Sequence, residues 1–253
     1  MTRFVGLLSG KGGVAKTTSV VNLGAAINYF CRDVTLVDGN LSTPHLGIHL
    51  GVPVVPISLH DALRGKNSLT EAVYLHPSGL KLVPAGLSLK DLTEVDSRDL
   101  KKIIPSLEGL TDIVLVDAPA GLSQEALAVM DCVDDIIIVT NPELPAITDA
   151  LKTVKLAEGK GKNVKGIIIA KSGDSTDISV ENIESLIEKP VLAVIPHDKA
   201  IRQALIKKDP VIYTHPMSKS AMAYKKLAAN LIGIEYKEEK EGFFRSLFNK
   251  IKN

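Results

Sequence analysis

Short runs of apolar residues recur along the chain, and most are followed by a segment whose apolar positions have helical spacing. The runs lie near residues 4, 34, 81, 113, 136, 167 and 192. Runs of this kind are typical of strands that are buried on both faces of a parallel sheet. The alternation predicts an α/β fold: a single doubly wound, mostly parallel sheet of at least seven strands, with helices on both faces.

Helices are expected between these strands, and the chain shows no internal repeat or second-domain boundary. The expected helices cover residues 17–30, 61–65, 69–74, 99–107, 146–158, 201–206 and 218–232. Residues 1–235 are therefore predicted to form one domain. Residues 236–241 include a run of five charges of both signs and are predicted to be a solvated linker, and residues 242–253 a separate tail.

Composition narrows the class of protein only a little. A hydrophobic content of 45% and a charged content of 23% are ordinary for a soluble protein, and the net charge of +1 gives no overall attraction to nucleic acid. Cys31 and Cys132 have neither metal-motif nor disulfide-framework spacing. No apolar run approaches the roughly 18 residues of a membrane span, and the chain enters its first strand without a signal-peptide pattern. We therefore expect a cytoplasmic protein.

The segment from Ser9 to Thr18 reads Ser-Gly-Lys-Gly-Gly-Val-Ala-Lys-Thr-Thr and lies between a predicted strand and a predicted helix. This context favours a phosphate-binding loop, because glycines let backbone N–H groups approach a phosphate at a helix N-terminus. Lys16 can reach the β- and γ-phosphates, and the Thr17 hydroxyl can ligate Mg²⁺. The expected nucleotide-binding residues are Gly10, Lys11, Gly12, Gly13, Val14, Ala15, Lys16, Thr17 and Thr18.

Two other predicted strands end in a carboxylate, at Asp38 and at Asp117. Loops at the carboxyl ends of parallel strands face the ligand crevice, so both side chains are expected near the phosphate or Mg²⁺. Gly121 is expected to turn its N–H toward a γ-phosphate. The alternatives are that Asp38 caps a turn or helix and that Asp117 is purely structural.

The early lysine of the loop, Lys11, gives the pattern Lys-Gly-Gly-x-x-Lys-Thr, which resembles the deviant Walker A motif of the MinD/ParA ATPases. The resemblance implies ATP or ADP with Mg²⁺, and an ATP-dependent homodimer in which Lys11 contacts the partner's nucleotide. It also implies that Asp38 lies in switch I and that Asp117 is the Walker B carboxylate. Pro196, His197 and Asp198 match the base-contacting loop. The family often has an acidic residue at the dimer face near Asp149, although a favourable place in the first turn of a helix is the plainer explanation.

The sequence departs from the family pattern at three positions. Ala15 replaces a glycine and would be strained if that position needs a positive φ. Asn40 replaces the second carboxylate of switch I, and an amide cannot take a proton from water, so slow hydrolysis is expected. Ala170 stands where the resemblance implies an adenine-reading asparagine.

Two metal-based readings are open alternatives. His45, His49 and His60 could form a metal cluster, but surface or capping roles are the plainer expectation. The nitrogenase iron protein shares the deviant loop and needs cluster-binding cysteines. Cys31, however, is expected at the end of the first helix and not in a loop over the nucleotide.

The tail after Gly242 forms an amphipathic pattern when it is placed on a helix. Its apolar residues fall within an arc of about 140°: they are Phe243, Phe244, Leu247, Phe248 and Ile251. The basic residues Arg245, Lys250 and Lys252 lie in the remaining arc. This pattern predicts reversible binding to an anionic membrane surface and resembles the membrane-targeting end of the MinD branch. Docking on its own domain or on a protein is the alternative.

Together these features predict an ATPase that dimerises with ATP at the inner face of the cell membrane. Its work would be to position an unidentified partner protein or to respond to an activator, in cell division or polar organisation. One alternative is a nucleotide-binding membrane scaffold that barely hydrolyses ATP because of Asn40. The other is a ParA-like DNA-segregation ATPase, although specific nucleic-acid binding is not expected from the charge.

Overall fold

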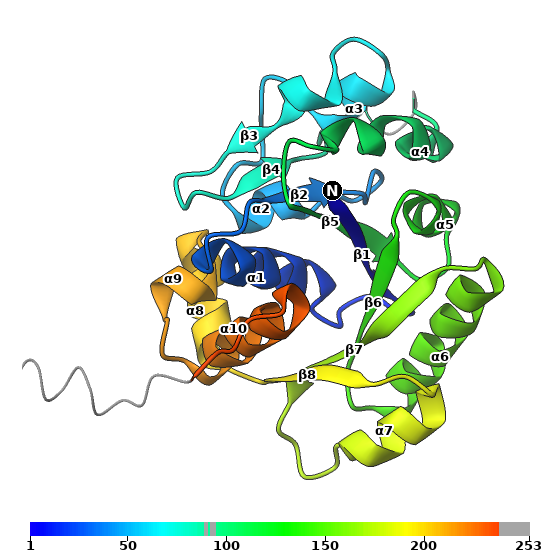
Figure 1. Cartoon of the computed structure of the whole chain (residues 1–253), viewed down its shortest axis with the longest axis vertical. Coiled ribbons are helices and arrows are strands. Elements are labelled where there is room, and N and C mark those ends of the chain that lie inside the picture. The colour runs from blue at the N-terminus through cyan, green and yellow to red at the C-terminus, as the bar shows by residue number, and fades with distance from the viewer. Residues whose placement is uncertain (89–90, 92–94, 238–253) are drawn as a thin grey trace, which may run out of the picture.

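A computed structural model of the chain describes residues 1–88, 91 and 95–237. Its centre is one eight-stranded sheet in the order β3-β4-β2-β5-β1-β6-β7-β8 (Figure 1). Every neighbouring pair is parallel except β3 and β4, so the predicted fold class is confirmed. The strands are β1 (Arg3–Ser9), β2 (Val34–Asp38), β3 (Tyr74–Leu75), β4 (Lys81–Val83), β5 (Ile113–Ala120), β6 (Asp135–Thr140), β7 (Asn163–Ser172) and β8 (Val191–Pro196).

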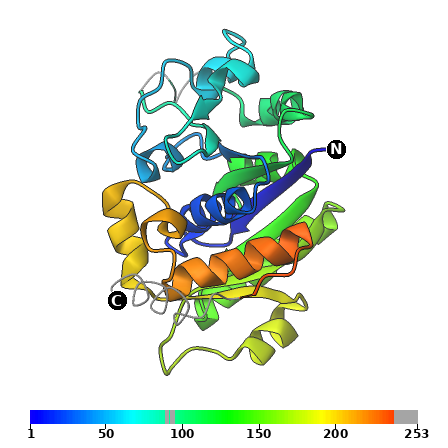
Figure 2. The ribbon, with the colours of Figure 1, turned by 60° about the vertical axis from the view of Figure 1, so that its left-hand side comes forward.

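Helices cover both faces of this sheet, as Figures 1 and 2 show. They are α1 (Lys16–Tyr29), α2 (Leu46–His49), α3 (Leu59–Leu63), α4 (Leu100–Ile103), α5 (Gln124–Asp131), α6 (Leu144–Gly159), α7 (Val180–Ile187), α8 (Lys199–Lys207), α9 (Val211–Thr214) and α10 (Lys219–Ile232). Three 3₁₀ turns, η1 (Leu69–Ala72), η2 (Ser97–Asp99) and η3 (Ile104–Leu107), complete the set within the described residues.

The core consists of two apolar layers, one on each face of the sheet. Successive residues of a strand point to opposite faces, so Leu7 packs in the layer that contains Leu23 of α1 and Tyr224 of α10. The next residue, Leu8, packs in the other layer with Val129 of α5. Strands buried on both sides explain why the sequence shows continuous apolar runs and not an alternating pattern.

Several helices differ from the sequence prediction. Helices α5 and α7 were not expected, although Ser123 and Ser179 cap their first turns. The helix expected over 99–107 is interrupted, because Pro105 has no N–H to donate, and the chain continues as η3. Helix α6 begins two residues earlier than expected, at Leu144, so Asp149 lies in its second turn and the first-turn explanation of this residue is wrong.

The carboxyl ends of β1, β2 and β5 meet at one edge of the sheet. In the parallel register Leu7 pairs with Asp117, and Asp38 also pairs with Asp117. Strand β1 lies between β5 and β6, where the order of strands reverses, and ligands of open α/β sheets bind at such a point. The fold therefore brings the glycine-rich loop and both strand-end carboxylates together.

The last described residues leave the domain beside the end of α1. The ring of Tyr236 packs edge-on against Phe30, with 5.6 Å between ring centroids, so the first residue of the predicted linker still contacts the domain. The rest of that linker from residue 238, and the predicted membrane tail with Phe243 to Lys252, lie outside the described residues. Within residues 1–88, 91 and 95–237, every helix is too short or too polar to cross a membrane.

Candidate functional site

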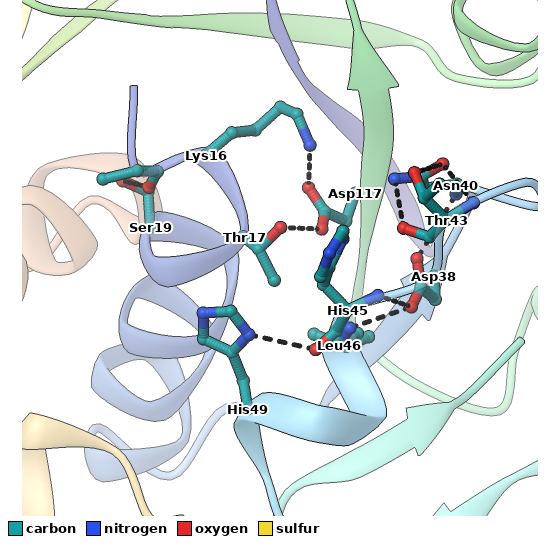
Figure 3. Close-up of polar contacts among 11 residues, drawn as sticks. Lys16, Thr17, Ser19, Asp38, Asn40, Thr43, His45, Leu46, His49 and Asp117 are labelled. Carbon is teal, nitrogen blue, oxygen red and sulfur yellow. Dashed lines mark hydrogen bonds and ion pairs between the residues drawn. The ribbon is translucent and has the colours of Figure 1, made fainter. Parts of the chain in front are cut away.

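Lys16 and Asp117 form the buried centre of the site (Figure 3). Lys16 is the first residue of α1, and its Nζ lies 2.5 Å from Oδ1 of Asp117 at the end of β5. Thr17 donates its hydroxyl to Oδ2 of the same carboxylate at 2.6 Å. The lysine and the carboxylate are both buried, so each neutralises a charge that would be costly to bury alone. A cation, a hydroxyl and a carboxylate thus converge at the N-terminus of a helix.

The loop before α1 turns through left-handed backbone conformations. Gly13 has φ +77°, and Ala15 has φ +69° and ψ +31°. The positive φ that would strain Ala15 is therefore present, and no side chain caps the N-terminus of α1. Gly10 is required for another reason: a Cβ there would lie 2.3 Å from the backbone oxygen of Asp149 in α6.

Asp38 is engaged with the backbone of the loop that follows it. Oδ2 accepts hydrogen bonds from the N–H groups of His45 (3.0 Å) and Leu46 (2.9 Å), and Oδ1 accepts from Asn40 N–H (3.3 Å). These are the bonds of a turn cap, the alternative to a metal role for this carboxylate. Burial, and secondly the charge of Asp117, raise the pKa of Asp38 to about 7.

Asn40 is committed to the same loop. Its Nδ2 donates to the backbone oxygen of Thr43 at 2.6 Å, and its Oδ1 accepts from the N–H and the hydroxyl of Thr43. The amide is therefore both donor and acceptor within a four-residue turn. A carboxylate in its place would keep the two accepted bonds and lose the donated one.

Two sets of backbone groups that the sequence assigns to the nucleotide make hydrogen bonds within the protein. Gly121 has φ +77°, and its N–H donates to the backbone oxygen of Ser9, the first residue of the loop segment, at 2.9 Å. In the predicted base-contacting loop, His197 N–H donates to the oxygen of Ser172 at 2.7 Å. The Asp198 side chain caps α8 through Ala200 N–H and bonds Ser220 in α10. These groups brace the edge of the sheet where β5, β7 and β8 end.

Lys11 lies at the rim of the site and not at its centre. Its Nζ is 3.2 Å from Oε2 of Glu143, just before α6, and both side chains are exposed to solvent. Exposed ion pairs of this kind contribute at most about 1 kcal/mol. The two lysines of the loop therefore differ: Lys16 is buried against Asp117, and Lys11 is held weakly at the surface.

Four residues line or brace the site although the sequence gave them no such role. Lys171, near the end of β7, donates to the backbone oxygen of Gly13 at 2.6 Å. Glu125 of α5 accepts from Leu41 N–H, Ser42 N–H and the Ser42 hydroxyl, which ties switch I to α5. His45 and His49 face the same hollow as Asn40. For Lys171, the available signal was a lysine directly after a buried strand at the ligand edge.

The hollow above the loop has a volume of about 480 Å³. Its lining consists of the loop, switch I and three further residues: Ser9, Lys11, Gly12, Gly13, Val14, Ala15, Lys16, Thr17, Thr18, Asn40, Thr43, His45, His49, Ala120 and Lys171. A larger hollow of about 670 Å³ lies between Ser42, Arg98 and Glu125. We assign the site to the smaller one because it contains the loop lysines and lies at the switch point of the sheet.

The metal-cluster alternatives find no support among the described residues. No group of three or more His, Cys, Asp and Glu side chains there is placed to hold a metal ion. His60 is fully buried in the core, and its Nδ1 accepts from Gly86 N–H. Cys31 follows α1 as expected, and burial raises the pKa of the Cys132 thiol to about 12. Neither cysteine lines the hollow.

The donor set of the hollow suits a nucleotide phosphate with Mg²⁺. A lysine and a glycine-rich loop at a helix N-terminus are ligands for phosphate oxygens. A hydroxyl and a carboxylate are the oxygen ligands through which Mg²⁺ is bound together with substrate phosphates and water. Lys16 and Thr17 line the hollow and supply the lysine and the hydroxyl, and Asp117, which contacts both, supplies the carboxylate.

Comparisons with known proteins agree with this site. A family model named ParA, described as NUBPL iron-transfer P-loop NTPase, matches residues 1–232. An uncharacterised ATP-binding protein of Methanocaldococcus jannaschii is 34% identical over 244 residues, which cover 94% of this chain and 92% of that protein. The match therefore extends over nearly the full length of both proteins.

Solved structures of similar fold also match over most of this chain. The septum site-determining protein MinD of Pyrococcus horikoshii, complexed with Mg-ADP, superposes with a TM-score of 0.88 at 36% identity, covering 91% of this chain and 96% of that one. A chain of the MinC:MinD cell division protein complex of Aquifex aeolicus superposes with a TM-score of 0.83 at 25% identity, covering 94% of this chain and 99% of that one.

Proposed function

The chain is a MinD-like member of the MinD/ParA family of P-loop NTPases, and on this premise we propose that it is an ATPase whose nucleotide state controls dimerisation and membrane binding. ATP with Mg²⁺ would join two copies face to face, and hydrolysis would separate them. The dimer would position a partner protein at a membrane, in cell division or another form of cellular organisation. The activity is thus spatial and not metabolic.

The observation that carries this proposal is the contact of Lys16 and Thr17 with the single carboxylate of Asp117. Lys16 and the loop N–H groups would hold the phosphates, and Thr17 and Asp117 would hold Mg²⁺. When bound, Mg²⁺ supplies positive charge to the phosphate oxygens during phosphoryl transfer. Asp38 would act on this centre from the neighbouring strand, directly or through the loop that it caps.

The exposed position of Lys11 supports a role across a dimer interface. Its ion pair with Glu143 is worth little, so the side chain can exchange that carboxylate for the phosphate of a second copy at small cost. A lysine that served its own nucleotide would be expected at the centre of the site, where Lys16 already stands. The proposed homodimer therefore needs Lys11 from each protomer.

The membrane part of the proposal rests on the tail pattern of residues 242–253. One short amphipathic helix binds weakly, because ordering it cancels much of the gain from its apolar side chains. Two tails on one dimer bind much more tightly, since the second binds at a high effective concentration. Dimerisation by ATP would in this way switch the protein between cytoplasm and membrane.

A second candidate function is a membrane scaffold that binds nucleotide but hydrolyses it very slowly. The engagement of Asn40 with Thr43 favours it, because an amide that is held in this turn cannot take a proton from the attacking water as a carboxylate can. This candidate shares the dimer and the tail with the first. Measuring steady-state phosphate release by the full chain separates the two.

The proposal is tested by measuring dimerisation and lipid binding of the full chain with Mg-ATP and with Mg-ADP. Light scattering should show a dimer with Mg-ATP only, and sedimentation with anionic vesicles should follow the same dependence. Lys11→Ala should bind ATP but stay monomeric and unbound to vesicles. Lys160→Ala is the matched control, because Lys160 also forms an exposed ion pair, with Asp131, away from the loop.

Removal of residues 242–253 should abolish vesicle binding and leave the ATP-dependent dimer intact. A Lys11→Ala protein that dimerises and binds vesicles as well as the parent would contradict the proposal. Binding to nonspecific DNA, lost steeply with salt and independent of the tail, would instead favour the ParA-like alternative.

A further inference from the structure

A buried tyrosine of α10 is hydrogen-bonded to the first turn of α1. Tyr224 is fully buried, and its Oη lies 3.0 Å from Oγ of Ser19, which is also fully buried. Ser19 lies on the same helix as Lys16 and Thr17 (Figure 3). Its Oγ also donates to the backbone oxygen of Ala15, the residue that precedes the helix, at 2.9 Å. The last helix of the described chain thus reaches the end of the phosphate loop.

The direction of these two hydrogen bonds follows from the number of hydrogens. A serine hydroxyl has one hydrogen, and that of Ser19 is used in the bond to Ala15. The oxygen of Ser19 therefore accepts from Tyr224, whose hydroxyl has no other partner among the described residues. Burial raises the pKa of Tyr224 to about 12, so this hydroxyl keeps its hydrogen at neutral pH. The two bonds connect Tyr224 through Ser19 to the oxygen of Ala15.

The oxygen of Ala15 belongs to the peptide through which the chain enters α1. It accepts from the N–H of Ser19 at 2.9 Å as well as from the Ser19 hydroxyl, so two donors hold it in line with the helix. This peptide is trans, and in a planar trans peptide the N–H points opposite to the C=O. The N–H belongs to Lys16. It therefore points away from the helix at the end where both residues line the hollow.

The backbone of Ala15 opposes this arrangement. Ala15 is left-handed, with φ +69° and ψ +31°, a conformation that is strained for an alanine. No side chain caps the N-terminus of α1. Relief of the strain would rotate the peptide between Ala15 and Lys16, and this rotation would turn the N–H of Lys16 away from a phosphate bound in the hollow. The donors on the oxygen of Ala15 resist that rotation.

We propose that Tyr224 is a positioning residue of the phosphate site: its hydroxyl, acting through Ser19, fixes the peptide that aims the N–H of Lys16 at a bound phosphate. The inference rests on the proposed function and adds a residue of α10 to that same site. Tyr224 does not touch the ligand. Its effect on binding comes from the conformation that it imposes on the backbone of the loop.

The test compares the full-length protein with Tyr224→Phe and Tyr213→Phe by calorimetric titration with Mg²⁺ and either ATP or inorganic tripolyphosphate. Phenylalanine keeps the ring and removes only the hydroxyl. Tyr213 is the matched control, because its hydroxyl also bonds α1, at the oxygen of Ala25 (3.2 Å) and at Nδ2 of Asn28 (3.0 Å), in later turns away from the loop. Thermal unfolding of each variant measures its stability.

Tyr224→Phe should weaken the binding of ATP and of tripolyphosphate equally, by about five- to tenfold, the loss expected for one buried hydrogen bond. Tyr213→Phe should change both affinities by less than about twofold, although its melting temperature should fall by a similar amount. Ser19→Ala should weaken binding at least as much as Tyr224→Phe. The double variant should lose no more than Ser19→Ala alone, because Tyr224 acts through this serine.

Three results would overturn the inference while leaving the proposed function in place. An affinity of Tyr224→Phe within about twofold of the parent would mean that the hydroxyl serves stability alone. Equal losses in Tyr224→Phe and Tyr213→Phe would mean that any loosening of α1 weakens binding. Additive losses in the double variant would mean that Tyr224 does not act through Ser19. If the parent binds neither ATP nor tripolyphosphate, the proposed function fails and this inference with it.

Discussion

Asp38 and Asp117 occupy paired positions at the ends of the adjacent parallel strands β2 and β5. Asp117 is balanced by the ammonium of Lys16, whereas Asp38 accepts only backbone N–H groups. Two buried carboxylates side by side cannot both be ionised cheaply, and burial together with the charge of Asp117 raises the pKa of Asp38 to about 7. Asp38 therefore holds its proton more tightly than a carboxyl group in water does, whereas Asp117 lies against a cation.

This difference predicts a pH dependence of stability. The folded protein holds the Asp38 proton more tightly than the unfolded chain does. The stability that this group contributes to the folded state is therefore fully present below about pH 4 and is lost as the pH rises through about 7. The free energy of unfolding should fall over this window by at most about 1.4 kcal/mol per pH unit from this group. Urea unfolding in the presence of EDTA at several pH values between 5 and 8 measures how the free energy of unfolding changes with pH.

Asp38→Asn should remove this part of the slope, because the amide does not titrate. Its oxygen can still accept from the N–H groups of His45 and Leu46, whereas its nitrogen cannot accept from Asn40 N–H. Asp149→Asn, at an exposed pair with Lys152, is the control and should leave the slope unchanged. Equal slopes for Asp38→Asn and the parent would show that Asp38 is not the group responsible.

Asn40→Asp should raise the steady-state rate of ATP hydrolysis by about tenfold or more, because a carboxylate can orient water and accept its proton. It should also cost about 1 to 2 kcal/mol of stability, since the oxygen of Thr43 loses its donor and faces a negative charge. Phosphate release and urea unfolding provide the two measurements. Asn40→Ala is the control: it should lose stability without gaining rate. A parent as fast as Asn40→Asp would contradict this role of Asn40.

Ala15→Gly should stabilise the protein by about 0.5 to 1 kcal/mol. Relief of the left-handed strain at φ +69° exceeds the extra entropy that glycine gives the unfolded chain. Gly13→Ala tests the same argument in reverse at φ +77°, where no atom would meet a new Cβ, and should destabilise by about 1 kcal/mol. Thermal unfolding decides both, and a lower melting temperature for Ala15→Gly would refute the strain argument.

Gly10→Ala should destabilise the protein by more than about 2 kcal/mol and weaken ATP binding. The new methyl would overlap the backbone oxygen of Asp149, so the loop and α6 must move apart. Gly12→Ala is the matched control, because its Cβ would lie 3.8 Å from that of Ala120, an ordinary contact. Similar losses for the two variants would mean that loop flexibility, and not this contact, requires Gly10.

The sequence alone determined the fold class and the centre of the site. Continuous apolar runs alternating with helical spacing specify a parallel sheet, because only strands buried on both faces tolerate such runs. Gly10 to Thr18 is a local motif whose conformation follows from its own glycines and from the helix it begins. Asp117 was found because a charged residue at the tip of a buried strand must lie at a sheet edge.

Only the tertiary structure showed which polar groups of the site are already hydrogen-bonded, because hydrogen bonds between distant segments produce no periodic pattern in the sequence. The contact of Lys171 with Gly13 spans 158 residues, and the hold of Glu125 on switch I spans 84 at Leu41. Asp38 and Asn40 stood at their expected positions, yet only the folded loop showed their partners to be backbone groups. The sequence gives the donors and acceptors that a side chain carries. Which of them are unpaired and can bind a ligand depends on the groups that the fold places within about 3 Å.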